Sequence, residues 1–113
     1  MLLHDRQIAF TKNVGLLIAF IYSKNYSATF GDAFRSAEQA ALNAASGKGI
    51  ANSLHCKRLA IDLNLFDAAG SYVTDKASYE PFGIYWKTLS PLNKWGGDFV
   101  HLVDSNHFEM TDK

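Results

Sequence analysis

The spacing of hydrophobic residues predicts a helix near the start of the chain. From about Asp5 to Ser23, apolar residues recur three or four positions apart, and the polar sequence SKN ends this pattern. The stripe includes Val14, Leu17 and Ile21. The aromatic sequence YSATFGDAF that follows, residues 26–34, is typical of a short strand.

An alanine-rich segment predicts a second helix. It has the sequence RSAEQAALNAASGKG, residues 35–49, with Ser36 as a plausible N-cap. Gly47 and Gly49 are expected to end the helix, because glycine readily adopts the conformation found after a last helical turn. The sequence IANSLHCK, residues 50–57, then reads as a loop.

The hydrophobic period changes to two in RLAIDLNLF, residues 58–66, which predicts a strand. One face of this strand is aliphatic, with Leu59, Ile61, Leu63 and Leu65. The opposite face is mixed, with Ala60, Asp62, Asn64 and Phe66. The sequence DAAGSYV, residues 67–73, is expected to turn the chain back as a hairpin.

The last third of the chain predicts a helix, a loop and a strand. The helix runs from about Lys76 to Leu89 and is expected to be interrupted near Pro81. A turn-rich loop, SPLNKWGGDF, follows, and Trp95 within it fits either the core or a cleft. In the final strand, His107 and Glu109 face one way. We therefore expect an α+β fold, a single compact domain over residues 1–113 whose helices pack on a small antiparallel sheet.

Composition narrows the class of protein. Hydrophobic residues make up 48% of 113 residues, which is typical of a globular domain. Lysine and arginine balance aspartate and glutamate at 11 each, so net charge gives no argument for a nucleic-acid partner. The apolar sequence VGLLIAFIY is too short to span a membrane and lacks the flanks of an export signal. The single cysteine, Cys56, excludes an internal disulfide and is interpreted as a packed side chain.

Asp62 raises the main chemical question of the sequence, because a buried carboxylate needs a partner. A metal ion is one partner, with His55 in the preceding loop and His107 near the end of the chain as further ligands. Asp104, three residues before His107, is then placed to take a proton from an attacking water. An ion pair with Lys57 or Arg58 explains Asp62 equally well from spacing alone.

Three segments resemble the M15 family of zinc peptidoglycan peptidases. SLHCKRLAID resembles the SxHxxGxAxD signature of the family, and WGGDF followed by DSNHFE resembles its second motif. FGDAFRSAEQAAL resembles a third family segment, and the three occur in the family order. The family includes D-alanyl-D-alanine carboxypeptidases, dipeptidases and phage endolysins that cut the L-alanyl–D-glutamate bond. The resemblance implies an M15 DD-peptidase fold of the hedgehog-like type.

Position by position, the resemblance implies one Zn²⁺ ion bound by His55, Asp62 and His107. Asp104 matches the catalytic acid of the family. Arg35 matches an arginine that contacts the scissile carbonyl and stabilises the oxyanion. Ser53 opens the first motif and is expected to bind substrate or support a ligand.

One departure from the signature is clear, because Arg58 stands where the family has glycine. It leaves the three ligands intact and puts the local loop shape in question. Asp98 is a weaker alternative to Asp104 as the base, and His4 and His101 have no assigned role.

The resemblance implies a monomeric zinc hydrolase that acts on peptidoglycan stem peptides, with neither nucleic acid nor membrane insertion. We expect a phage or prophage endolysin made in the bacterial cytoplasm without a signal peptide, which reaches the cell wall after a holin-type pore opens. One alternative is a D-Ala-D-Ala carboxypeptidase or dipeptidase using the same residues. Another is a zinc-stabilised wall-binding domain without catalysis.

Overall fold

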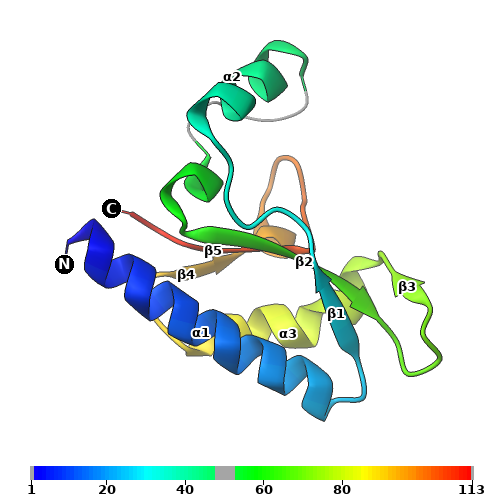
Figure 1. Cartoon of the computed structure of the whole chain (residues 1–113). Coiled ribbons are helices and arrows are strands. Elements are labelled where there is room, and N and C mark those ends of the chain that lie inside the picture. The colour runs from blue at the N-terminus through cyan, green and yellow to red at the C-terminus, as the bar shows by residue number, and fades with distance from the viewer. Residues whose placement is uncertain (1, 48–52, 113) are drawn as a thin grey trace.

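A small antiparallel sheet with helices on both sides forms the protein, as seen in a computed structural model that describes residues 2–47 and 53–112 (Figure 1). The elements in chain order are α1 (Leu3–Ser23), β1 (Ser27–Phe30), α2 (Ala37–Ala45), the 3₁₀ turn η1 (Leu54–Lys57), β2 (Ala60–Phe66), β3 (Tyr72–Val73), α3 (Lys76–Thr88), β4 (Asn93–Trp95), the 3₁₀ turn η2 (Gly96–Asp98) and β5 (His107–Met110). No helix among the described residues is long and apolar enough to cross a membrane.

The sheet is built around β2, which is the longest strand. The strand order is β1-β2-β5-β4, and β3 pairs with the far end of β2. Every pairing is antiparallel. The first half of β2 therefore lies between the extension of β1 and the C-terminal strand β5, where Asp62 stands directly opposite His107.

One face of the sheet carries the hydrophobic core. Helices α1 and α3 lie side by side beneath this face in Figure 1. The alternating residues that the sequence assigned to the apolar face are Leu59, just before β2, and Ile61, Leu63 and Leu65 within it, and all are at most 5% exposed. Trp86 of α3 is fully buried and contacts Phe10 of α1 edge to face. The aliphatic face of β2 thus holds both helices, as its period predicted.

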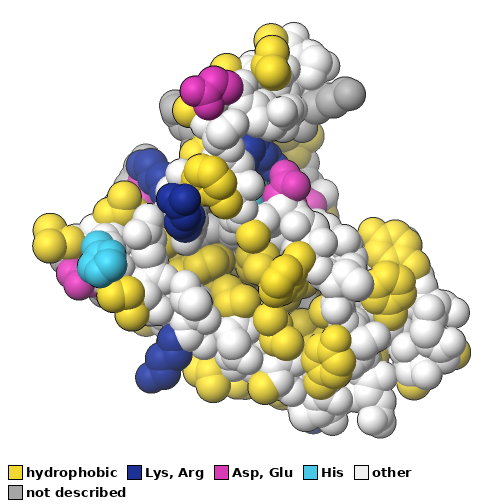
Figure 2. All heavy atoms as spheres, in the orientation of Figure 1, with side chains coloured by type: hydrophobic (Ala, Val, Ile, Leu, Met, Phe, Trp, Pro, Cys, Tyr) yellow, Lys and Arg dark blue, Asp and Glu magenta, His cyan; other side chains and the backbone are white. Residues whose placement is uncertain are grey.

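The opposite face of the sheet is covered only in part. The segment after β1 crosses it and leads into α2, which stands away from the body of the molecule at the top of Figure 1. In Figure 2, basic and acidic side chains gather below the α2 lobe, where it meets the body. This division leaves the mixed face of β2, which carries Asp62, accessible between α2 and the sheet.

The expected α+β architecture is confirmed, and so are the predicted helices and the β2–β3 hairpin. Ser36 caps α2 by accepting a hydrogen bond from the amide of Gln39 at 3.1 Å, and Gly47 follows the helix with a φ of 78°. The rest of the expected ending, at Gly49, and the loop residues 50–52 lie outside the described residues.

Two expectations about the last third of the chain are wrong. Helix α3 is continuous through Pro81, which lies in its second turn and removes one backbone hydrogen bond without ending the helix. The segment interpreted as a loop contains strand β4, which pairs with β5, followed by η2. Trp95 of β4 is 2% exposed and belongs to the core, which decides between its two interpretations.

Arg58, the departure from the family signature, adopts a left-handed backbone conformation. Its φ is 57° and its ψ is 36°, a region that glycine adopts freely but in which the Cβ atom of other residues is crowded. The residue ends η1 and turns the chain into β2, so the loop shape that a glycine would allow is retained. The guanidinium lies 4.1 Å from the ring centroid of Phe34, and this cation–π contact offsets part of the backbone strain.

Replacement of Arg58 tests this balance. Arg58→Gly removes both the strain and the ring contact, whereas Arg58→Ala removes the contact and keeps the strain. We expect the glycine variant to be more stable than the alanine variant by about 1 kcal/mol, as measured by urea unfolding. An alanine variant as stable as the glycine variant would contradict the left-handed conformation.

Candidate metal centre and active site

The site begins with a pair of residues on neighbouring strands. Asp62 of β2 and His107 of β5 are 45 residues apart in sequence and directly opposite in the sheet. The Nδ1 atom of His107 lies 3.1 Å from Oδ1 of Asp62. Both side chains leave the sheet on the face opposite the core. The period-two pattern of each strand placed these two residues on polar faces, and the antiparallel register brings them together.

His55 joins this pair from the 3₁₀ turn before β2. Its Nε2 atom lies 3.4 Å from the same Asp62 oxygen, and the residue is 3% exposed. The hydroxyl of Ser53 accepts a hydrogen bond from the amide of His55 at 3.1 Å and so caps the turn. The loop therefore folds back onto the strand, as the metal-site hypothesis predicted. Ser53 supports His55 through its backbone and also lines the cavity described below.

The three side chains have the geometry of a metal site. One ligand atom from each of His55, Asp62 and His107 lies within 4.8 Å of the others, the one such group among residues 2–47 and 53–112. In a tetrahedral zinc site with bonds of about 2.0–2.1 Å, neighbouring ligand atoms lie about 3.3 Å apart. The 3.4 and 3.1 Å separations from Asp62 match this value. Two imidazoles and one carboxylate are also ligands that zinc accepts, so these residues fit the ion.

The pKa values of this cluster answer the question of what Asp62 is paired with. Burial would raise the pKa of Asp62, but hydrogen bonds with His107 and His55 outweigh it and hold the pKa at about 2. Burial would likewise lower the pKa of His107, whereas hydrogen bonds with Asp62 and Glu109 raise it to about 9. Neither Lys57 nor Arg58 is the partner, because Lys57 pairs with Asp112 and Arg58 lies over Phe34.

Asp104 lies at the edge of the cluster. Its Oδ2 atom is 3.9 Å from Nδ1 of His107, and its backbone carbonyl accepts a hydrogen bond from the His107 amide at 3.1 Å. The side chain is 52% exposed, so water reaches it. Burial of its other part raises the pKa of Asp104, and the charge of Asp62 adds to this while His107 opposes it. A raised pKa brings a carboxylate closer to the pH at which it can accept and return a proton.

Two adjacent glycines hold the Asp104 turn in place, a role that their sequence alone does not reveal. A Cβ atom on Gly96 would lie 2.1 Å from the Asp104 carbonyl oxygen, so only glycine allows this approach. Gly97 and Gly83 both contact the indole of Trp95, and the indole nitrogen donates to the Ser105 carbonyl at 2.7 Å. The turn that carries Asp104 is thus fastened to the core.

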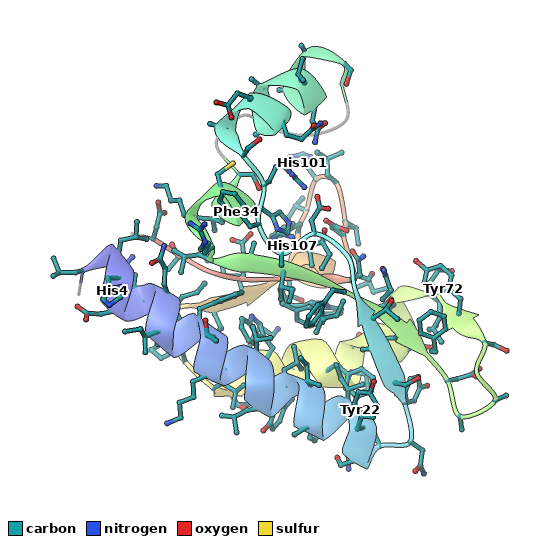
Figure 3. The ribbon with its side chains drawn as sticks, in the orientation of Figure 1. His4, Tyr22, Phe34, Tyr72, His101 and His107 are labelled. Carbon is teal, nitrogen blue, oxygen red and sulfur yellow. The ribbon has the colours of Figure 1, made fainter. Side chains whose placement is uncertain are left out.

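A cavity of about 610 Å³ opens over the cluster. Its lining includes the three residues of the cluster and Asp104, together with Arg35, Ser53, Phe99, His101 and Glu109, among others. Figure 3 shows His101 and His107 on the α2 side of the sheet, with His4 far away at the start of α1. His101 therefore lies near the site although the sequence assigned it no role.

Arg35 reaches the same cavity. Its guanidinium pairs with Asp32 at 2.6 Å, and its Nε atom is buried without a hydrogen-bond partner among the described residues. Asp98, the alternative base, pairs instead with Lys87 at 2.5 Å and does not line the cavity. The Sγ atom of Cys56 lies 3.9 Å from the Ser36 carbonyl and takes no part in the cluster.

Comparisons with known proteins identify the family and the fold. A family profile described as D-alanyl-D-alanine carboxypeptidase matches residues 46–110, more than half of the chain. The fold is similar to the crystal structure of the Serratia marcescens L-Ala D-Glu endopeptidase ChiX, with a TM-score of 0.75 and 18% identity over 90% of this chain and 77% of that chain. At this identity the likeness concerns the fold. The sequence matches no curated protein.

The close approach of Gly96 to Asp104 predicts a position-specific cost. Gly96→Ala forces the Asp104 turn to move and is expected to lower the free energy of unfolding by about 1–3 kcal/mol. Gly15→Ala is the control, because a Cβ on this helical glycine meets nothing within 4 Å. That control should gain roughly 0.5–1 kcal/mol from helix propensity. Thermal unfolding of both variants measures the difference, and equal effects would contradict the described contact.

The raised pKa of His107 predicts how pH changes the stability of the metal-free protein. Folding favours the protonated ring, so its contribution is complete below the unfolded pKa of 6.5 and is lost as pH rises through about 9. Wild-type protein in chelator should exceed His107→Gln in stability most at pH 5.5, by at most a few kcal/mol. The difference should shrink by pH 9.5 in thermal unfolding. A difference that grows with pH would contradict the assignment.

Proposed function

Because the chain belongs to the M15 family of peptidoglycan peptidases, we propose that it is a zinc-dependent hydrolase that cleaves an amide bond in peptidoglycan stem peptides. One observation carries the proposal: the residues matching the family motifs, His55, Asp62, His107 and Asp104, meet at one cavity. They come from η1, β2, β5 and the turn before β5. The described residues form one compact unit, which supports residues 1–113 as a single catalytic domain.

We propose His55, Asp62 and His107 as the ligands of one zinc ion. Such an ion, when bound, lowers the pKa of a coordinated water towards about 7 and polarises a carbonyl group. Three protein ligands rather than four are typical of catalytic zinc sites, so an ion held by these residues would keep one position for water or substrate. The negative charge of Asp62 would offset part of the charge of such an ion in this partly buried site.

Asp104 performs the proton transfers in the proposed mechanism. Its half-exposed carboxylate takes a proton from the attacking water and later returns it to the leaving amine. The Gly96 contact and the Ser105 hydrogen bond hold the turn, so the carboxylate is oriented before the substrate binds. Arg35 lines the same cavity, and the positive charge of its guanidinium is proposed to stabilise negative charge on the carbonyl oxygen.

The bond we propose is the one between L-alanine and D-glutamate. The ChiX structure, whose title describes an L-Ala D-Glu endopeptidase, supports this choice through the shared fold. The description of the matching family, D-alanyl-D-alanine carboxypeptidase, favours the second candidate, removal of a terminal D-alanine. An endolysin role and a monomeric state stay predictions.

The proposal is tested by the release of amines from purified peptidoglycan. The protein is treated with chelator, then zinc is added back, and the products are identified by mass spectrometry. Zinc-restored release of new N-termini supports a peptidase, and the product masses identify the bond. A folded, zinc-loaded protein that binds peptidoglycan without releasing amines would instead support a wall-binding domain.

Replacement of Asp104 tests the assigned proton transfers. Asp104→Asn preserves the size of the side chain but removes the base, so kcat/KM should fall by about 10²–10⁴-fold. Zinc content, measured by atomic absorption, should stay the same. Asp98→Asn is the matched control, since Asp98 pairs with Lys87 outside the cavity, and its turnover should remain near the wild-type value. Wild-type turnover by Asp104→Asn would exclude the assigned role.

A further inference from the structure

We propose that Glu109 is a positioning residue that holds His107 with its Nδ1 atom directed into the metal site. This inference rests on the proposed zinc site and adds a residue that the motif comparison did not assign. Glu109 follows His107 by two positions in β5, so both side chains lie on the same face of the strand. Both also line the cavity.

The contact between the two side chains is short and partly shielded from water. Oε1 of Glu109 lies 2.6 Å from Nε2 of His107, and the two side chains are 16% and 10% exposed. The other ring nitrogen, Nδ1, lies 3.1 Å from Asp62. The imidazole is therefore held at both nitrogens, by a carboxylate on either side, in one orientation.

This arrangement determines which nitrogen can bind a metal. An ionised carboxylate only accepts hydrogen bonds, so Nε2 of His107 carries the proton and donates it to Glu109. Nδ1 also faces a carboxylate, Asp62, but it shares that carboxylate with His55, so the proton on Nδ1 is the one that a metal ion would replace, and the proton on Nε2 would stay with Glu109. A carboxylate behind a histidine ligand also increases the basicity of the ring and fixes its orientation.

His55 shows that the support of His107 is specific. The Nδ1 atom of His55 is buried and has no hydrogen-bond partner among the described residues. His55 is oriented instead through its backbone, by the Ser53 cap of η1. Of the two histidines, only His107 has a carboxylate besides Asp62 against its ring in the described part of the chain, so loss of Glu109 should affect one ligand alone.

The position of Glu109 distinguishes this role from direct metal binding and from a purely structural one. Its carboxylate contacts Nε2, on the side of the ring away from the Asp62 contact. Its contribution to the core is made by the backbone carbonyl, which accepts a hydrogen bond from the Trp86 indole at 3.1 Å. Substitution of the side chain leaves this contact in place.

Zinc affinity is the first readout. The dissociation constants of wild type, Glu109→Ala, Glu109→Gln and Glu80→Ala are measured by competition with a chromophoric chelator. Glu109→Ala should bind zinc about 10–100-fold more weakly. Glu109→Gln, whose amide oxygen still accepts the Nε2 hydrogen, should recover most of the loss. Glu80, exposed on α3, is the control and should match wild type.

The protonated nitrogen is the second readout. Long-range ¹H–¹⁵N NMR spectra of zinc-loaded wild type should show His107 protonated at Nε2 and metal-bound at Nδ1. Unchanged zinc affinity in Glu109→Ala, or metal bound at Nε2, would overturn the proposal. If Glu109→Ala does not fold, the wild-type NMR spectrum and the zinc affinity of Glu109→Gln still test the proposal.

These readouts separate the inference from the proposed activity. If the protein binds zinc and the Glu109 variants change its affinity as expected, but no amines are released, the peptidase proposal is refuted and the role of Glu109 stands. If the protein releases amines but its zinc affinity is the same with and without the Glu109 side chain, only the role of Glu109 is refuted. Wild type that binds no zinc overturns both.

Discussion

The pairing of Asp62 with His107 across β2 and β5 is the contact on which the rest of the site depends. A shift of β5 by one residue against β2 would turn His107 to the core face and bring Phe108 out to the cavity, leaving Asp62 without its partner. Such a shift would bury charge and expose an aromatic ring, so the hydrophobic core itself enforces the register that assembles the site. His55 and Asp104 then need only short turns to reach the pair.

The two faces of the sheet separate stability from chemistry. The face against α1 and α3 is apolar, and its residues form the hydrophobic core with those two helices. The other face carries a cluster of opposite charges whose members stabilise one another's ionised forms, as the low pKa of Asp62 and the high pKa of His107 show. In this cluster a proton on His107 balances part of the negative charge of Asp62, and a divalent ion bound there as proposed would displace that proton.

The positions of Asp62 and His107 were predictable because strand periodicity is a strong local signal. The motif spacing also placed His55 and Asp104 correctly beside them. What the sequence could not reveal depends on tertiary contacts. Strand β4 is only three residues long and surrounded by turn-forming residues, so it exists because β5 pairs with it.

Other features were missed for the same reason. Glu109 contacts His107 because the two side chains share one face of β5. Their separation of two positions is visible in the sequence. Ordinary surface strands show the same separation, so it does not by itself indicate a contact. His101 reaches the cavity through a loop whose path no periodic pattern describes. Arg58 departs from the expected glycine, and only the observed φ and its contact with Phe34 explain how an arginine is accommodated.

The distance in sequence between Asp62 and His107 has a consequence for how the protein is made. Their pairing closes a loop of 45 residues, and such non-local strand pairing is slow to form because its entropic cost is met before its contacts are gained. While the chain is still being synthesised, β5 is absent and His55 and Asp62 alone cannot hold an ion with three protein ligands. If His55, Asp62 and His107 bind a metal as proposed, its capture needs β5 in place, so the proposed hydrolase would stay inactive until this strand has been made and has paired with β2.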